Sequence, residues 1–237
     1  MQNEHIGVRE SVKDTAKVLG ALSDFIIARV FSHKTLKDLA ANSNAHVINA
    51  LCNLYHPCQA LADFLSIKEL LGEEAFSSPK RVKLAYIGDG NNVAHSLMLG
   101  TALLGQELAI ICPAGRSPDA QLALFAMELA AKHGGKISIS SDKRELEGAS
   151  LLYTDTWISL GDECSKEEAK AYFAGFEVSS ALLDSYKIEH FFHCLPAYEG
   201  MEIESGLLHG SKSRVFLQAK NRLWAQAALL LALDRAL

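Results

Sequence analysis

The segment His56-Pro57-Cys58-Gln59 contains residue types at a spacing that suits chemistry. It follows a short apolar stretch, residues 47–50, and opens an apolar-periodic stretch that predicts a helix over 57–71. A helix N-terminus offers unpaired N–H groups and a positive dipole end, which suit an anion. Pro57 fits a first turn, because its missing N–H would have no intrahelical partner. His56 and Gln59 can face one bound group there. The alternative is a structural helix cap with an incidental histidine.

Other polar residues also follow predicted strands. The carboxyl ends of these strands carry Arg29, Asn91-Asn92, residues 155–159 and His193-Cys194. In open parallel sheets, ligands bind at the carboxyl ends of the strands. Polar residues that gather at this edge from two domains therefore outline a cleft.

Three of these residues suit acyl transfer. Arg29 is a fixed cation with a forked donor, suited to a phosphate or a carbonyl oxygen. His56 and Gln59 can donate to a carbonyl oxygen and bind an amide, as in an oxyanion-type site. Arg29 could instead pair with a surface carboxylate, and this alternative stays open.

A second group suits an amino acid. Asn92, Asp155 and Ser159 supply an amide, a carboxylate and a hydroxyl that could hold an α-amino and α-carboxylate pair. The Cys194 thiol could be a nucleophile, a hydrogen-bond partner or a ligand. Alternatively, Asp155 caps a turn and Cys194 is a plain buried thiol. His193 fits packing or support of a neighbour better than catalysis.

No cofactor or metal is expected. The nine histidines show no metal-ligand spacing. A dinucleotide-binding site is also poorly supported. Gly88 and Gly90 are not followed by the third glycine of the dinucleotide fingerprint. The predicted strand 108–112 is followed by Pro113-Ala114 and not by the acidic residue that the fingerprint requires.

The elements that position these residues alternate between strand and helix, which favours the α/β class. We expect two doubly wound parallel-sheet domains, residues 1–72 and 73–220, and a closing helix over 221–237 that packs back on the first domain. The first domain has only two predicted strands, 24–31 and 47–50, and is therefore incomplete as a parallel domain. The second has predicted strands at 82–87, 108–112, 136–140, 151–154, 190–194 and 215–217.

Composition excludes several classes of function. The chain has 237 residues, 49% hydrophobic and 22% charged, with a net charge of -5. That charge gives no reason to expect nucleic acid or an anionic membrane as partner. There is no apolar run of membrane-spanning length, and Met1 to His5 is unlike a signal peptide. Five cysteines without a CxxC spacing indicate reduced thiols and a cytoplasmic protein.

Several segments together resemble the aspartate/ornithine transcarbamylases, and specifically their ornithine branch. They are Ala28-Arg29-Val30-Phe31, residues 56–63, residues 87–92, residues 154–161, His193-Cys194-Leu195-Pro196-Ala197 and Ala219-Lys220-Asn221-Arg222. They follow the family's order over nearly the whole chain. The His-Cys-Leu-Pro segment separates the ornithine branch from the aspartate branch, which lacks that cysteine.

The resemblance implies carbamoyl transfer from carbamoyl phosphate to the δ-amino group of L-ornithine, giving L-citrulline and phosphate in arginine biosynthesis. Residues 1–72 would be the carbamoyl-phosphate-binding domain and 73–220 the ornithine-binding domain. The implied carbamoyl phosphate contacts are Arg29, His56, Gln59, Cys194, Leu195 and Arg222. The implied ornithine contacts are Asn92, Asp155, Ser159 and Leu160, the last standing where many members have Met. Arg29, His56 and Cys194 would be catalytic, with Cys194 assisting the δ-amine. The resemblance also implies a homotrimer without a cofactor.

One departure from the family concerns the N-terminus. Family members carry a further N-terminal part with a Ser-x-Arg-Thr-type phosphate loop, which does not occur in these 237 residues. Each missing charge-assisted contact would cost about 1.5–3 kcal/mol of carbamoyl phosphate binding. We therefore expect impaired activity. Two alternatives stay open: a catalytically silent remnant that binds an amino acid or serves in assembly, and a transcarbamylase for another amine such as putrescine.

Overall fold

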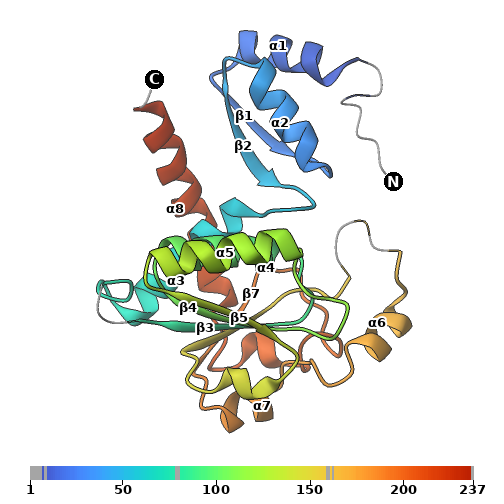
Figure 1. The fold of residues 1–237 in the computed structure, drawn as a ribbon, viewed down its shortest axis with the longest axis vertical. Helices are drawn as coiled ribbons and strands as arrows, with labels where there is room; N and C mark the ends of the chain where they lie inside the picture. The colour runs from blue at the N-terminus through green and yellow to red at the C-terminus, as the bar shows by residue number, and fades with distance from the viewer. Residues whose placement is uncertain (1–6, 8–9, 78–80, 159–160, 162, 236–237) are drawn as a thin grey trace.

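Two parallel sheets form the framework of the chain (Figure 1). The computed structural model describes residues 7, 10–77, 81–158, 161 and 163–235. The first sheet pairs β1 (Phe25–Arg29) with β2 (His46–Leu51) in parallel. The second has the order β5-β4-β3-β6-β7, also parallel throughout. Its strands are β3 (Lys83–Ile87), β4 (Glu107–Ile111), β5 (Lys136–Ser140), β6 (Leu151–Thr154) and β7 (His190–His193). The expected α/β class and two-stranded first sheet are confirmed.

Helices connect the strands and cover the sheets. They are α1 (Val12–Leu22), α2 (His33–Asn42), α3 (Pro57–Leu71), α4 (Asn92–Leu103), α5 (Ala120–Lys132), α6 (Lys166–Tyr172), α7 (Ser180–Ser185) and α8 (Val215–Asp234), with 3-10 turns η1 (Lys143–Leu146) and η2 (Leu207–His209). None of the described helices is long and apolar enough to cross a membrane.

The second sheet has a topological switch between β3 and β6. The chain moves outward from β3 through β4 and β5, and then returns to pair β6 with the other side of β3. The connections after β3 and β6 therefore leave in opposite directions. This arrangement opens a crevice at the carboxyl ends of the two strands, where doubly wound sheets bind ligands.

Apolar packing fixes both faces of the second sheet. Helices α4 and α5 lie over one face and α7 under the other (Figure 1). Tyr86 and Phe192 point toward the α4–α5 side, where Ile67 of α3 joins the core. Ile87 and Phe191 point toward the opposite side, in a core that includes Val215 at the start of α8. Burial on both faces explains why these strands are apolar throughout.

Helix α3 joins the two sheets. It follows β2 of the first sheet, and its residues pack with α4 and α8. The C-terminal half of α8 faces the first sheet, where Ile27, Ile48 and Leu229 line a cavity of about 70 Å³. The closing helix thus packs on α3, and its C-terminal half lies across this cavity from the first sheet.

The sequence reading was wrong over residues 215–217, expected as a strand. Val215 is the first residue of α8, which begins there and not at 221. The buried residues Val215, Gln218, Asn221 and Ala225 recur at helical spacing. A three-residue apolar run cannot distinguish strand from helix, because the longer period lies outside it. The short helix α7 was also not predicted.

The loop after β3 requires glycine at position 90. A Cβ atom there would lie 2.2 Å from the Pro118 nitrogen and 2.5 Å from the Ser117 carbonyl carbon. Both are backbone atoms, so no side-chain rotation relieves the clash.

We expect Gly90→Ala to lower the free energy of unfolding by about 3 kcal/mol, the upper range for overpacking. Gly148→Ala is the control, since Gly148 has a φ of +76° but no atom within 4 Å of the added Cβ. Its backbone cost should be about 1 kcal/mol. Urea denaturation of both variants tests this, and an equal or smaller loss at Gly90 would contradict the packing argument.

Candidate active site

His56 stands at the N-terminus of α3. It is the N-cap residue and makes no side-chain cap, with Pro57 in the first turn. Its backbone N–H donates to Ser96 Oγ of α4 over 2.7 Å, which anchors the start of α3 to the second sheet's helix layer. The imidazole is 5% exposed, and its Nδ1 has no hydrogen-bond partner among the described residues. A buried ring atom without a partner is costly unless a ligand supplies one.

His56 is neutral at physiological pH. Burial lowers its pKa to about 4, and the positive charges of Arg222 and Arg29 act in the same direction, while Asp155 opposes them. A neutral imidazole has one N–H donor and one acceptor nitrogen. The site therefore contains two guanidinium groups and an uncharged imidazole that can donate a hydrogen bond.

Asn91 and Asp155 meet at the switch between β3 and β6. Asn91 is the N-cap of α4, and its Oδ1 accepts from the N–H groups of Val93 and Ala94. Its Nδ2 donates to Asp155 Oδ2 over 2.7 Å. A single asparagine thus starts the helix and orients the carboxylate that follows β6. Asn92 instead donates to the Cys52 carbonyl oxygen over 2.8 Å, which ties the loop after β2 to α4.

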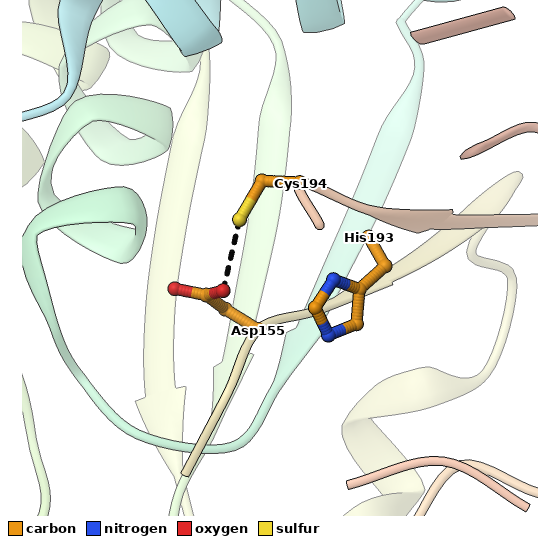
Figure 2. Close-up of side chains that lie close together, drawn as sticks. All are labelled: Asp155, His193 and Cys194. Carbon is orange, nitrogen blue, oxygen red and sulfur yellow. Dashed lines mark hydrogen bonds between the residues drawn. The ribbon is translucent and has the colours of Figure 1, made fainter. Parts of the chain in front are cut away.

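Cys194 follows β7 and points toward Asp155 (Figure 2). Its thiol donates to Asp155 Oδ1 over 2.9 Å. Burial raises the pKa of the Cys194 thiol well above its usual range, and the adjacent Asp155 carboxylate raises it further. Cys194 is therefore a protonated thiol at neutral pH. Of the roles left open, the arrangement favours the hydrogen-bond partner.

His193 is a supporting residue. Its Nδ1 accepts from the Leu195 N–H over 2.9 Å, so its Nε2 carries the proton that faces Glu202 Oε1 at 3.2 Å. Leu195 has a φ of 59°, a conformation rare for residues other than glycine, and the ring nitrogen helps to hold it. The side chains of His193 and Glu202 are fully buried.

The ligand atoms of Asp155, His193 and Cys194 all lie within 4.8 Å of one another (Figure 2). This proximity alone would suit a metal ion. However, both ring nitrogens of His193 are engaged, and the Cys194 thiol and the Asp155 carboxylate are paired with each other. The donor set therefore fits a hydrogen-bonded cluster better than a metal site.

One cavity of about 290 Å³ joins these groups. The predicted residues that line it are Arg29, His56, Asn92, Asp155, Cys194, Leu195 and Arg222. They come from the ends of β1, β2, β3, β6 and β7 and from α8. Asn91 and Thr156 line it as well; the sequence placed them at the strand ends that outline the cleft but assigned them no ligand contact. The pair of asparagines in the loop after β3, at a helix N-cap position, was the available signal for Asn91.

Three predicted residues lie elsewhere or cannot be described. Gln59 is 1% exposed and is not among the residues that line this cavity, and its Nε2 donates to Asp63 Oδ1 over 2.8 Å. Ser159 and Leu160 fall outside the described residues, so their predicted contact with ornithine stays a prediction.

Two family models match the chain. The carbamoyl-P binding domain of aspartate/ornithine carbamoyltransferase matches residues 1–69, and the Asp/Orn binding domain matches residues 80–233. The chain belongs to the aspartate/ornithine carbamoyltransferase family. Members of this family are transferases, and the resemblance stated from the motifs is confirmed.

The relatives are ornithine carbamoyltransferases. The enzyme of Moritella abyssi is 46% identical to this chain, and the match covers 98% of this chain and 75% of that enzyme. The enzyme of Methanocaldococcus jannaschii is 45% identical, and the match covers 95% of this chain and 73% of that enzyme. The crystal structure of the anabolic enzyme from Campylobacter jejuni has a TM-score of 0.90 at 38% identity, covering 98% of this chain and 76% of that one. The structure of the Pyrococcus furiosus enzyme has a TM-score of 0.87 at 41% identity, and the match covers 94% of this chain and 70% of that one. The chain thus spans about three quarters of its relatives' length.

The low pKa of His56 predicts a pH-dependent stability. In the unfolded chain the imidazole has its ordinary pKa of about 6.5, so between pH 6.5 and 4 the unfolded state binds more protons than the folded state. Stability is therefore lost as the pH falls through this window. Relative to His56→Asn, the wild type should lose about 3 kcal/mol between pH 8 and pH 4.

Denaturant titrations at several pH values measure this difference. His133→Asn is the control, because His133 is exposed and should leave the wild-type pH dependence intact. Parallel curves for the wild type and His56→Asn would show that the imidazole is not held neutral.

Proposed function

We propose that the chain transfers the carbamoyl group of carbamoyl phosphate to the δ-amino group of L-ornithine, giving L-citrulline and phosphate in arginine biosynthesis. One observation carries the proposal: a single cavity brings two guanidinium groups and a neutral imidazole against a hydrogen-bonded carboxylate and thiol. The names of the relatives support the same substrates. A homotrimer remains an expectation from the resemblance.

Carbamoyl phosphate fits the cationic side of the cavity. The guanidinium groups of Arg29 and Arg222 can pair with phosphate oxygens, for which a forked donor is well suited. The neutral His56 imidazole can donate to the carbonyl oxygen and so stabilise the negative charge that develops there. A protonated His56 would be repelled by the same two arginines, which is why the neutral form belongs to this site.

Ornithine fits the side that holds Asp155. Its carboxylate, oriented by Asn91 and Cys194, attracts an ammonium group, and Asn92 supplies a nearby amide. The predicted contacts of Ser159 and Leu160 would complete this half. The δ-amine must lose a proton before it can attack, because an ammonium nitrogen has no free electron pair.

The reaction then balances within this site. The δ-nitrogen forms a bond to the carbamoyl carbon, and the carbonyl oxygen takes up negative charge facing His56 and Arg29. The bond from that carbon to the phosphate oxygen breaks, and phosphate leaves with the electron pair and accepts one of the two protons on the attacking nitrogen, which keeps the other. The Cys194 thiol already carries its own proton and orients Asp155.

A citrulline assay on the purified chain tests the proposal. We expect citrulline formation that depends on both ornithine and carbamoyl phosphate. Putrescine, which lacks the α-carboxylate, is the comparison. Ornithine binding without citrulline would favour the catalytically silent alternative. Preferential carbamoylation of putrescine would favour the alternative of another amine.

Variants of Cys194 test the thiol's role. Cys194→Ala removes the hydrogen bond to Asp155 and should lower kcat/KM for ornithine by about 10- to 100-fold, the value of one hydrogen bond to a charged group. Cys194→Ser keeps an O–H donor, so its loss of kcat/KM should be several-fold smaller than that of Cys194→Ala. Steady-state kinetics at a pH high enough to deprotonate the δ-amine measure kcat/KM for both variants. Equal losses in the two variants would mean that the sulfur acts by more than donation.

A further inference from the structure

A chain of buried polar side chains crosses the interface between α3 and α8. At its centre is Asp63 of α3, which is fully buried. Its Oδ1 accepts from Gln59 Nε2 over 2.8 Å and from Gln218 Nε2 of α8 over 2.7 Å. The catalytic scheme above does not use Asp63, and a buried carboxyl group is costly unless it is hydrogen-bonded, as Asp63 is here.

The chain continues to the strand that carries Cys194. Gln218 Nε2 also donates to Tyr153 Oη of β6 over 2.8 Å. Its Oε1 accepts from the backbone N–H of His193 over 3.1 Å, at the end of β7. Asp63 is therefore connected on one side to the first turn of α3 and on the other side to the residue before the catalytic thiol.

The bond to Asp63 also decides how the Gln59 amide is oriented. A carboxylate can accept hydrogen bonds but cannot donate them, so the Gln59 side-chain NH2 faces Asp63 and the Gln59 side-chain oxygen faces away. That oxygen is buried and has no partner among the described residues. Gln59 lies one turn after His56, whose ring lines the cavity. A buried acceptor without a partner is costly unless a bound group supplies a hydrogen-bond donor, and Gln59 belongs to the same helix turn as the cavity residue His56.

We propose that Asp63 is a positioning residue: it fixes the Gln59 side-chain oxygen as the acceptor for the NH2 of the carbamoyl group, and through Gln218 it ties that acceptor to β7. This inference rests on the proposed function for the identity of the ligand, and on the hydrogen-bond chain for the tie itself.

The charge of Asp63 supports this role. Burial raises the pKa of the Asp63 carboxyl to about 7, and the hydrogen bonds from Gln218, Gln59 and Tyr153 limit the rise. The titratable or charged groups that bear on it are Tyr153 on β6, Cys194 after β7 and Arg222 on α8. The group therefore changes charge near neutral pH, and its hold on the two amides should strengthen as the pH rises.

Ligand selectivity tests the proposal. Phosphonoacetamide carries the carbamoyl NH2 on a stable methylene link, and acetonylphosphonate replaces that NH2 with a methyl group. By calorimetry the wild type should bind the amide about tenfold more tightly than the ketone, the value of one hydrogen bond. Asp63→Asn can present either end of its own amide to Gln59, so the preference should fall to within about twofold.

Ser66→Ala is the matched control. Ser66 lies three residues further along α3, is fully buried, and accepts from Asn221 of α8 over 3.0 Å without contacting Gln59. It should keep the tenfold preference. A preference retained in Asp63→Asn, or lost equally in Ser66→Ala, would overturn the proposal, because a purely structural role would affect both ligands alike.

A measurement on the wild type covers the case in which Asp63→Asn does not fold. With ¹⁵N-glutamine labelling, the side-chain NH2 signals of Gln59 and Gln218 should shift together with a midpoint near pH 7. If the two signals shift with different midpoints, or do not shift, Asp63 does not couple Gln59 to Gln218. If the wild type binds neither ligand and forms no citrulline, the proposed function fails. The amide titration still decides whether Asp63 couples the two helices.

Discussion

The contact between α3 and α8 holds the active-site cavity together. The first sheet supplies Arg29 and His56, and the second supplies Asp155 and Cys194. Helix α3 follows directly from the first sheet and packs against α4 and α8. Its partner α8 leaves the core of the second sheet at Val215 and carries its far end to the first sheet. Any change in the angle between α3 and α8 would therefore separate the two halves of the site.

The charges in the cavity follow from this arrangement. Burial keeps the His56 imidazole neutral by lowering its pKa, and the charges of Arg222 on α8 and Arg29 on the first sheet add to this effect. Burial and, after it, the adjacent Asp155 carboxylate raise the pKa of the Cys194 thiol, so the thiol stays protonated. Positive and negative groups thus face each other across a ligand-sized space. A phosphate and an ammonium group can each meet the opposite charge there without displacing a buried ion pair.

The sequence predicted the parts of the site that depend on strand ends. Parallel strands present their carboxyl ends at one edge, so Arg29, His56 and Asp155 could be grouped without knowledge of the fold. Residues 215–217 were misread, because three apolar residues carry no period. The roles of Asn91 and Gln218 could not be predicted, because each depends on a hydrogen bond to a residue distant in the chain. Periodicity shows which face is buried and not which polar atoms meet on it.

Buried polar contacts explain why this interface has one register. Apolar side chains alone would allow α8 to slide or rotate along α3 at little cost, since apolar contacts are not directional. Asp63 and Ser66 of α3 each match one amide on α8, from Gln218 and Asn221. A shift by one residue would leave these groups buried without partners, at about 1–3 kcal/mol each. Asp63 therefore helps to fix the helices and also orients the Gln59 amide. We infer that the register of α3 on α8 and the geometry of the carbamoyl site are set by one set of hydrogen bonds.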